Sequence, residues 1–264
     1  SGIFAAVRKA GDTWWLRAGI ASFAVLLLLI MISPVFINPL FNEYKPLPDG
    51  PVKSAILSLA RANQIPTDNV KYFDASKQTT RVSANVSGFM GTTQVSLNDN
   101  LLNKTSLPEV KAVMGHEMGH YVLNHAVRNL AYISLVLMFG FWVVHKLIDQ
   151  AITRFGVRYG ISERTDPAVL PIAVAVFSFY MLLATPVINS IIRTAEKEAD
   201  LYGLNSAREP HGFATAAMRL STYRKIHPGY WEEVIFYDHP SGYDRVHSSM
   251  LWLKENQQLV ETSQ

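Results

Sequence analysis

Two histidines and a glutamate in one short segment, His116, Glu117 and His120, have the types and spacing of a metal-dependent hydrolytic site. On an α-helix, residues four apart lie on one face, one turn apart, so both imidazoles point at one place and suit a tetrahedral zinc ion. Glu117 lies on the same turn, where it can take a proton from a metal-activated water and pass it to a leaving amine. This His-Glu-x-x-His spacing is typical of zinc peptidases and predicts one zinc ion per chain.

The same three side chains could instead be solvated polar residues on an ordinary surface helix. Their neighbours, which include Val113, Met114, Met118 and Val122, leave little of the helix polar. Because a mostly apolar helix is buried rather than solvated, we favour the metal site.

A catalytic zinc site needs a third protein ligand and an open position. The candidates downstream are the other histidines and an acidic cluster, Glu196-Lys197-Glu198-Ala199-Asp200. His120 precedes the second of three apolar segments and Glu196 follows the third, so a chain that crosses a membrane twice returns to the same side. This favours Glu196 as the third ligand, with Asp200 able to orient an imidazole from the same helix face. Taken alone, the cluster could equally be the hydrated start of a helix at a membrane surface.

These three apolar segments are the elements that must carry the site. Residues 18–42 and 167–192 contain no charged residue, and each exceeds the roughly 20 residues needed to cross a bilayer as a helix. Residues 129–144 can span if Lys146 extends to the interface. Trp14 and Trp15 are typical interfacial anchors of the first segment. Buried helices of a large soluble core are the alternative, but uncharged runs of this length rarely suit a globular domain.

Composition agrees with a membrane protein. Of 264 residues, 49% are apolar and only 17% are charged, whereas about a quarter are charged in an average soluble domain. The chain has no cysteine, so any metal must be held by His, Asp, Glu or carbonyl groups. The net charge is +3, and the basic residues are scattered along the chain, which argues against nucleic acid as a partner. The positive charge mildly favours contact with an anionic bilayer.

A hairpin and a capped helix are predicted between the first two segments. Apolar residues alternate over residues 79–98, around a turn at 88–91. Either residues 81–87 or 92–98 could offer an edge on which a peptide adds as an extra strand, and an ordinary structural hairpin is equally open. Ser106 and Glu109 form a capping-box pattern that predicts where the motif helix begins, and residues 52–63 have helical spacing.

These patterns predict a mainly α fold of polytopic membrane helices, with a zincin-like catalytic helix and a small β-hairpin or sheet beside the active site. We expect four parts. Residues 1–44 hold the first transmembrane helix, and 45–128 the hairpin and the motif helix. Residues 129–192 hold the second and third transmembrane helices, and 193–264 the third zinc ligand.

Several short motifs occur in order along most of the chain: residues 38–42 (NPLFN), 74–76 (DAS), 84–89 (ANVSGF), 115–120 (GHEMGH), 124–125 (NH), 196–200 (EKEAD), 238–241 (DHPS) and Arg245. In this combination the sequence resembles the type I CAAX prenyl proteases, the Ste-type integral-membrane zinc metallopeptidases related to the heat-shock protease HtpX. Family members carry further spans before the region that corresponds to residue 1. A fragment, a processed form and a short member are therefore all open.

The resemblance implies that His116, His120 and Glu196 bind zinc and that Glu117 is the general base. It implies peptide or protein substrates, lipidated or otherwise associated with the bilayer.

Three further residues take roles from the resemblance. Asp200 matches an aspartate that is considered a proton donor, and His239 and Arg245 would flank the site and stabilise an oxyanion. Without the resemblance, His239 could be an ordinary loop histidine. His125 fits a group that supports the site better than a ligand.

We expect a multi-pass membrane zinc metalloendopeptidase, acting in CAAX-type processing or in membrane-protein quality control. A catalytically silent scaffold or transport component that retains a peptidase fold is the alternative, which the intact Glu117 disfavours. A hydrolase of lipid head groups is weaker, because the hairpin edge favours a peptide. Basic residues before the first span place the site outside the cytoplasm, whereas the resemblance implies a cytoplasmic site, which we follow.

Overall fold

The computed structural model describes residues 2–88, 93–222 and 224–261, and its contacts divide the chain into two compact units. The first, here called the span unit, comprises Ser1–Leu28 and Val127–Ile191. The second, the sheet unit, comprises Leu29–Ala126 and Ile192–Gln264. Both are mainly helical, and the sheet unit adds a four-stranded mixed sheet, so the predicted fold class is confirmed.

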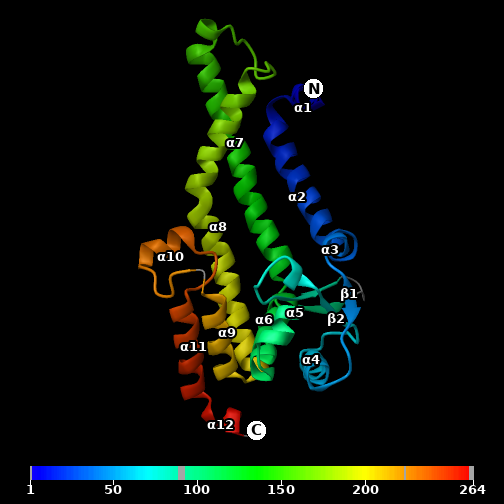
Figure 1. Ribbon diagram of the computed structural model, residues 1–264. Helices are drawn as coiled ribbons and strands as arrows, with labels where there is room; N and C mark the ends of the chain where they lie inside the picture. Colours follow the sequence, from blue (N-terminus) through cyan, green and yellow to red (C-terminus); the bar gives the residue numbers. More distant parts are fainter. Residues whose placement is uncertain (1, 89–92, 223, 262–264) are drawn as a thin grey trace. The chain divides into compact units, whose positions relative to one another are not determined.

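Within the described part of the chain, three stretches of helix are long and apolar enough to cross a membrane, as predicted. Two of them are α7 (His125–Tyr159) and α8 (Val169–Ala207) (Figure 1). The other runs through α1 (Gly2–Ala10), α2 (Trp14–Ile32) and α3 (Asn38–Phe41). A π-helical turn at Ser33–Ile37 joins α2 to α3 and contains Pro34, which cannot donate a backbone hydrogen bond.

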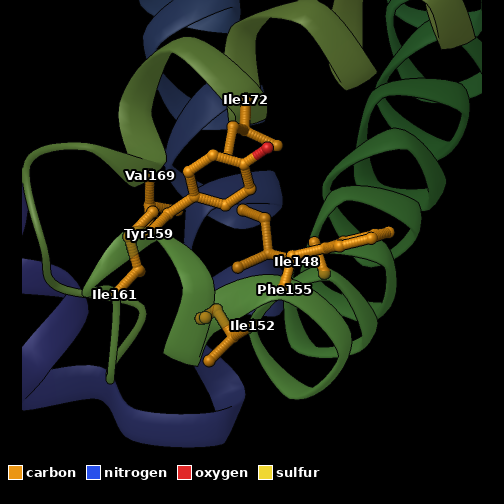
Figure 2. Close-up of a pocket in the computed structure, with 9 residues that line it drawn as sticks. Ile148, Ile152, Phe155, Tyr159, Ile161, Val169 and Ile172 are labelled. Carbon is orange, nitrogen blue, oxygen red and sulfur yellow. The ribbon is translucent and has the colours of Figure 1, made fainter.

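Polar contacts within the span unit pair Arg164 with two carboxylates and join Trp14 to His145. Arg164 binds both carboxylate oxygens of Asp149, and its Nη1 lies 2.6 Å from Oδ1 of Asp12. The indole of Trp14 donates to Nδ1 of His145 at 3.0 Å. The unit also contains an apolar pocket of about 320 Å³ (Figure 2), lined by Ile148, Ala151, Ile152, Phe155, Gly156, Tyr159, Ile161, Val169 and Ile172.

The sheet has the strand order β1-β2-β4-β3, formed by β1 (Tyr44–Pro46), β2 (Val70–Phe73), β4 (Gln94–Asn98) and β3 (Ala84–Ser87). β3 and β4 pair antiparallel, which confirms the predicted hairpin. Of its predicted turn at 88–91, residues 89–91 lie outside the described residues. β4 also pairs in parallel with β2 and is therefore internal. The interpretation of residues 92–98 as a free edge is therefore wrong, because both sides of β4 are already paired.

A core between the sheet and three helices supports the motif helix. The helices are α4 (Pro51–Ala62), α5 (Asp99–Lys104) and α6 (Leu107–Val122). The core side chains are fully or almost fully buried, and they include Ile56, Val95, Leu97, Leu101, Val110, Met114 and Met118. Each such burial contributes about 1.5–3 kcal/mol. One side of α6 is therefore held firmly against the sheet.

The C-terminal region adds α9 (Pro210–Leu220), α10 (Tyr230–Phe236), α11 (Gly242–Glu255) and α12 (Gln257–Glu261) (Figure 1). A second buried cluster joins α6, α8, α9 and α11 through Ala112, Leu204, Phe213, Ala217 and Trp252. The Trp252 indole donates to Asn205 Oδ1 at 2.7 Å. These contacts place the loop before α11 beside the motif helix.

Candidate metal centre and active site

The start of α6 is built as its sequence predicts. Ser106 donates its backbone N–H to Glu109 Oε2 at 2.8 Å, which completes the capping box. Glu109 is buried, and its other oxygen lies 3.2 Å from Arg219 on α9. Burial opposes ionisation of Glu109, but the hydrogen bonds from Ser106 and Arg219 outweigh it and lower its pKa. The first turn of the motif helix is thereby tied to a second helix.

Glycines let α6 and α8 approach until their backbones touch. A Cβ on Gly203 of α8 would meet the backbone nitrogen of His116 at 2.8 Å, and a Cβ on Gly119 of α6 would meet the Cα of Ala199 at 3.2 Å. No side chain fits such a gap without displacing backbone. This close packing brings Glu196 and Asp200 on α8 opposite the two motif histidines.

The three predicted ligand side chains converge on one point. His116 Nε2 and His120 Nε2 lie 3.0 Å apart. Glu196 Oε2 lies 3.4 Å from His116 Nε2, and Glu196 Oε1 lies 3.4 Å from His120 Nε2. Ligand atoms around a tetrahedral zinc ion with bonds of about 2.0–2.1 Å are separated by about 3.3 Å. Glu196 Oε2 is also buried without a hydrogen-bond partner. Two facing imidazole nitrogens and an unsatisfied carboxylate oxygen are what a bound cation would satisfy, so the donor set fits a metal.

Asp200 and Arg245 stand behind His116. His116 Nδ1 lies 2.8 Å from Asp200 Oδ1, and Arg245 contacts both carboxylate oxygens of Asp200, through Nε at 2.9 Å and Nη2 at 2.5 Å. All three side chains are about 10% exposed. Asp200 therefore lies between the imidazole of His116 and the guanidinium of Arg245, in close contact with both.

His125 and Glu198 stand behind His120 in the same way. His125 Nδ1 lies 2.9 Å from His120 Nδ1, and its Nε2 lies 3.0 Å from Glu198 Oε2. The His125 side chain is only 2% exposed, whereas Glu198 is 41% exposed. α6 ends at Val122, and a turn with Asn124 at φ 53° separates it from α7, which begins at His125. This turn directs His125 back towards His120.

The surroundings of the motif helix shift the pKa values of His116 and Glu117. Burial would lower the pKa of His116, but the neighbouring carboxylates of Asp200 and Glu196 outweigh it and raise the value to about 10. Burial raises the pKa of Glu117, partly opposed by His116 and His120. A carboxylate with a raised pKa accepts a proton more readily than an ordinary one, which suits a general base.

His239 lies at the rim of the cluster, on the loop before α11. Its Nε2 lies 3.4 Å from Glu196 Oε2, and its Nδ1 lies 2.9 Å from Asp238 Oδ1. Arg224 contacts the same Asp238 oxygen at 2.8 Å. The side chain of His239 is 41% exposed. The ring is therefore oriented from behind and accessible in front.

A cavity of about 200 Å³ joins the cluster to the edge of the sheet. Its walls come from the residues before and within β3, from α6 with His116 and Glu117, from α9, and from the loop with His239. Among the described residues β3 pairs only with β4. Val95 donates its backbone N–H to the carbonyl oxygen of Asn69, on the side away from β3. Val86 lies opposite Val95 in the antiparallel pair. Because the two residues of such a pair point their backbone groups in opposite directions, Val86 directs its own N–H and C=O towards the free edge. The cavity reaches β3 at Ala84, two residues before Val86, so it lies beside this free edge.

Comparison with known proteins identifies the family. A family model described as peptidase family M48 matches residues 46–249. The chain belongs to peptidase family M48. A model described as the CAAX prenyl protease N-terminal region with five membrane helices matches residues 1–43. Together with the three candidate spans, these matches make the chain an integral membrane protein of a metallopeptidase family.

Curated relatives agree with this assignment. A Bacillus subtilis protein described as the uncharacterized metalloprotease YhfN is 32% identical over 91% of this chain and 57% of its own length. CAAX prenyl protease 1 of Saccharomyces cerevisiae is 33% identical over 68% of this chain and 43% of its own length. The chain therefore spans about half the length of the curated relatives that it matches.

A solved structure supports the fold. The crystal structure of S. mikatae Ste24p superposes with a TM-score of 0.78 at 24% identity, over 94% of this chain and 61% of that protein. The mainly helical architecture with its small sheet is shared.

The structure brings together the candidate site residues that the sequence analysis named. It also shows contacts of two further residues, Arg224 with Asp238 and Glu198 with His125. Arg224, which orients Asp238, carries no spacing signal, because a single arginine in a loop has no sequence context. Glu198 belongs to the acidic cluster, yet only the fold shows that it faces His125.

Proposed function

We propose that this chain carries the catalytic centre of a membrane-embedded zinc metalloendopeptidase. The observation that carries the proposal is the convergence of His116, His120 and Glu196 on one point beside Glu117. A single zinc ion held by these three side chains would supply Lewis-acid chemistry, by lowering the pKa of a water molecule and polarising the scissile carbonyl.

Glu117 is the proposed general base and proton shuttle. It takes a proton from the attacking water and delivers it to the leaving amine, and its raised pKa suits the first step. His239 directs Nδ1 at Asp238, so in its doubly protonated form it can donate a hydrogen bond from Nε2 to the oxyanion that develops on the substrate.

Asp200 is proposed as an orienting group for His116. A carboxylate that contacts both Arg245 and His116 is held ionised, which suits positioning better than proton donation. Arg245 then acts through Asp200, since its Nε and Nη2 are engaged by that carboxylate.

The proposed substrate is an extended peptide that adds as a strand to β3. The outward backbone groups of Val86 supply main-chain hydrogen bonds that tolerate many sequences. Because the chain is an integral membrane protein, we propose membrane-associated proteins as substrates. Cleavage of a matched pair of peptides, with and without a prenyl group, separates CAAX-type processing from general quality control.

Metal content and peptide cleavage test the proposal. We expect the wild-type protein to contain one zinc ion per chain, and Glu117→Gln to keep the metal and lose cleavage. Zinc binding without cleavage by the wild type would indicate the silent scaffold instead. Absence of zinc would refute the metal centre.

The catalytic side is proposed to be cytoplasmic. The chain has no cysteine, so a single introduced cysteine at the exposed Lys197 can be labelled in intact cells with a membrane-impermeant maleimide. Labelling without permeabilisation would place this side outside the cytoplasm.

A further inference from the structure

Helix α10 exposes large aromatic side chains. Tyr230 is 74% exposed, Trp231 70% and Phe236 72%. The rings of Tyr230 and Trp231 lie 5.2 Å apart, and Phe236 ends the same seven-residue helix, so α10 exposes a large apolar area of a kind that water does not favour. Some other medium or partner must contact this surface, which we call the α10 aromatic surface.

The position of α10 along α8 indicates what that medium is. Arg193 on α8 places its Nη1 at 3.0 Å from the carbonyl oxygen of Glu233 and at 2.6 Å from that of Tyr237. Tyr237 caps the end of α10, and the Glu233 carbonyl already accepts from the backbone N–H of Tyr237, so the guanidinium adds a further contact at this helix end. One guanidinium group therefore holds α10 at the level of Arg193.

Arg193 marks the end of a membrane span. It is the first charged residue after the uncharged run 167–192, and α8 is continuous through it. The part of α8 before Arg193 is about 36 Å long at 1.5 Å per residue, which covers a hydrocarbon core of about 30 Å. Arg193, and α10 with it, therefore lies at the depth of the membrane interface.

A second marker in the same unit agrees. Leu40, at the end of the first span, is 79% exposed, and Phe41 is 61% exposed, directly before the polar residues Asn42 and Glu43. Both residues lie in α3, at the end of the first candidate span.

The acidic residues of α10 do not oppose contact with a membrane. Glu232 binds Lys225 at 2.9 Å, and Glu233 accepts from the backbone N–H of Ser241 at 3.3 Å. Tyrosine and tryptophan side chains favour the headgroup region, where an apolar ring and a polar atom are both satisfied.

We propose that α10 lies in the interface of the lipid bilayer, with Tyr230, Trp231 and Phe236 among the headgroups. The helix leads through Tyr237 and Asp238 to His239, whose Nε2 lies 3.4 Å from Glu196. Contact with lipid at α10 therefore holds the rim of the cavity at the membrane surface, where a membrane-associated chain passes.

Site-directed spin labelling of the full chain tests this directly, because no native cysteine has to be removed. Trp231→Cys is labelled with a nitroxide in phosphatidylcholine–phosphatidylglycerol vesicles. Its relaxation by oxygen, which partitions into lipid, is compared with that by a water-soluble nickel complex. Leu40→Cys on α3 is the lipid control, and Leu251→Cys on α11, which is 45% exposed, is the water control.

We expect the ratio of oxygen to nickel accessibility at position 231 to be several-fold above that at 251 and closer to that at 40. A ratio equal to that at 251 would overturn the proposal. Protection from both reagents would also overturn it, because a protein segment would then cover α10. Repeating the measurement in Glu117→Gln keeps the outcome independent of catalytic activity.

Discussion

Removal of the buried imidazole of His125 tests how the fold supports the metal centre. If His120 Nε2 faces the metal, its Nδ1 carries the proton and donates to His125 Nδ1 at 2.9 Å. His125 must then carry its own proton on Nε2 and donate it to Glu198 at 3.0 Å. This relay orients His120 and strengthens it as a ligand. His125→Phe removes both nitrogens while a ring still fills the buried site.

The expected loss follows from the burial of the relay. Loss of a group that orients a metal ligand typically costs about 10–100-fold in metal affinity, which is about 1.4–2.7 kcal/mol. His125 is 2% exposed, so water cannot replace it, and we expect the upper half of this range. Glu198 is 41% exposed, so for Glu198→Gln we expect a loss of less than about tenfold, because water and the amide oxygen can substitute.

Competition with a chromophoric chelator measures zinc affinity without relying on turnover. Lys197→Ala is the matched control, since its side chain is exposed on the same helix turn. Thermal unfolding of the metal-free proteins checks that each variant is folded. A folded His125→Phe protein that binds zinc within about twofold of the wild type would refute the supporting role.

Three further perturbations test the architecture around the site. Gly203→Ala should cost about 1–3 kcal/mol of stability and weaken zinc binding, because its Cβ meets His116 N at 2.8 Å; Gly229→Ala, with no atom within 4 Å, should change neither. Glu109→Gln should lower the melting temperature at pH 7. The difference from the wild type should shrink as the pH falls below 4.5, the ordinary pKa of a glutamate, because a carboxylate with a lowered folded-state pKa stabilises the fold only where it is ionised. A difference that does not depend on pH would contradict this. Val86→Pro should lower kcat/KM for peptides, because it removes an outward backbone N–H from β3 without removing a hydrogen bond to β4. The control variant Val86→Ala keeps this N–H and should retain activity. Equal activity of the two variants would exclude strand addition at this edge.

Features set by near neighbours in the chain could be predicted from the sequence. The capping box of Ser106 and Glu109 needs only one helical turn, and the common direction of His116 and His120 follows from a spacing of four residues. Two spans follow from the length of the uncharged runs 18–42 and 167–192, and the span that contains residues 129–144 needed Lys146 to extend to the interface. The proximity of Glu196 to the motif followed from counting two crossings, although its role as a ligand stays a proposal.

Tertiary packing decided the features that depend on distant segments. The sequence left both strands of the hairpin open as the edge, and only the parallel pairing of β4 with β2 leaves β3 free. The contact of His125 with Glu198 and the attachment of α10 to Arg193 join residues that are 73 and at least 40 positions apart. Local spacing carries no information about such pairs, because their distance depends on how closely whole helices pack. At the centre of this protein that distance is set by glycines that let α6 and α8 touch.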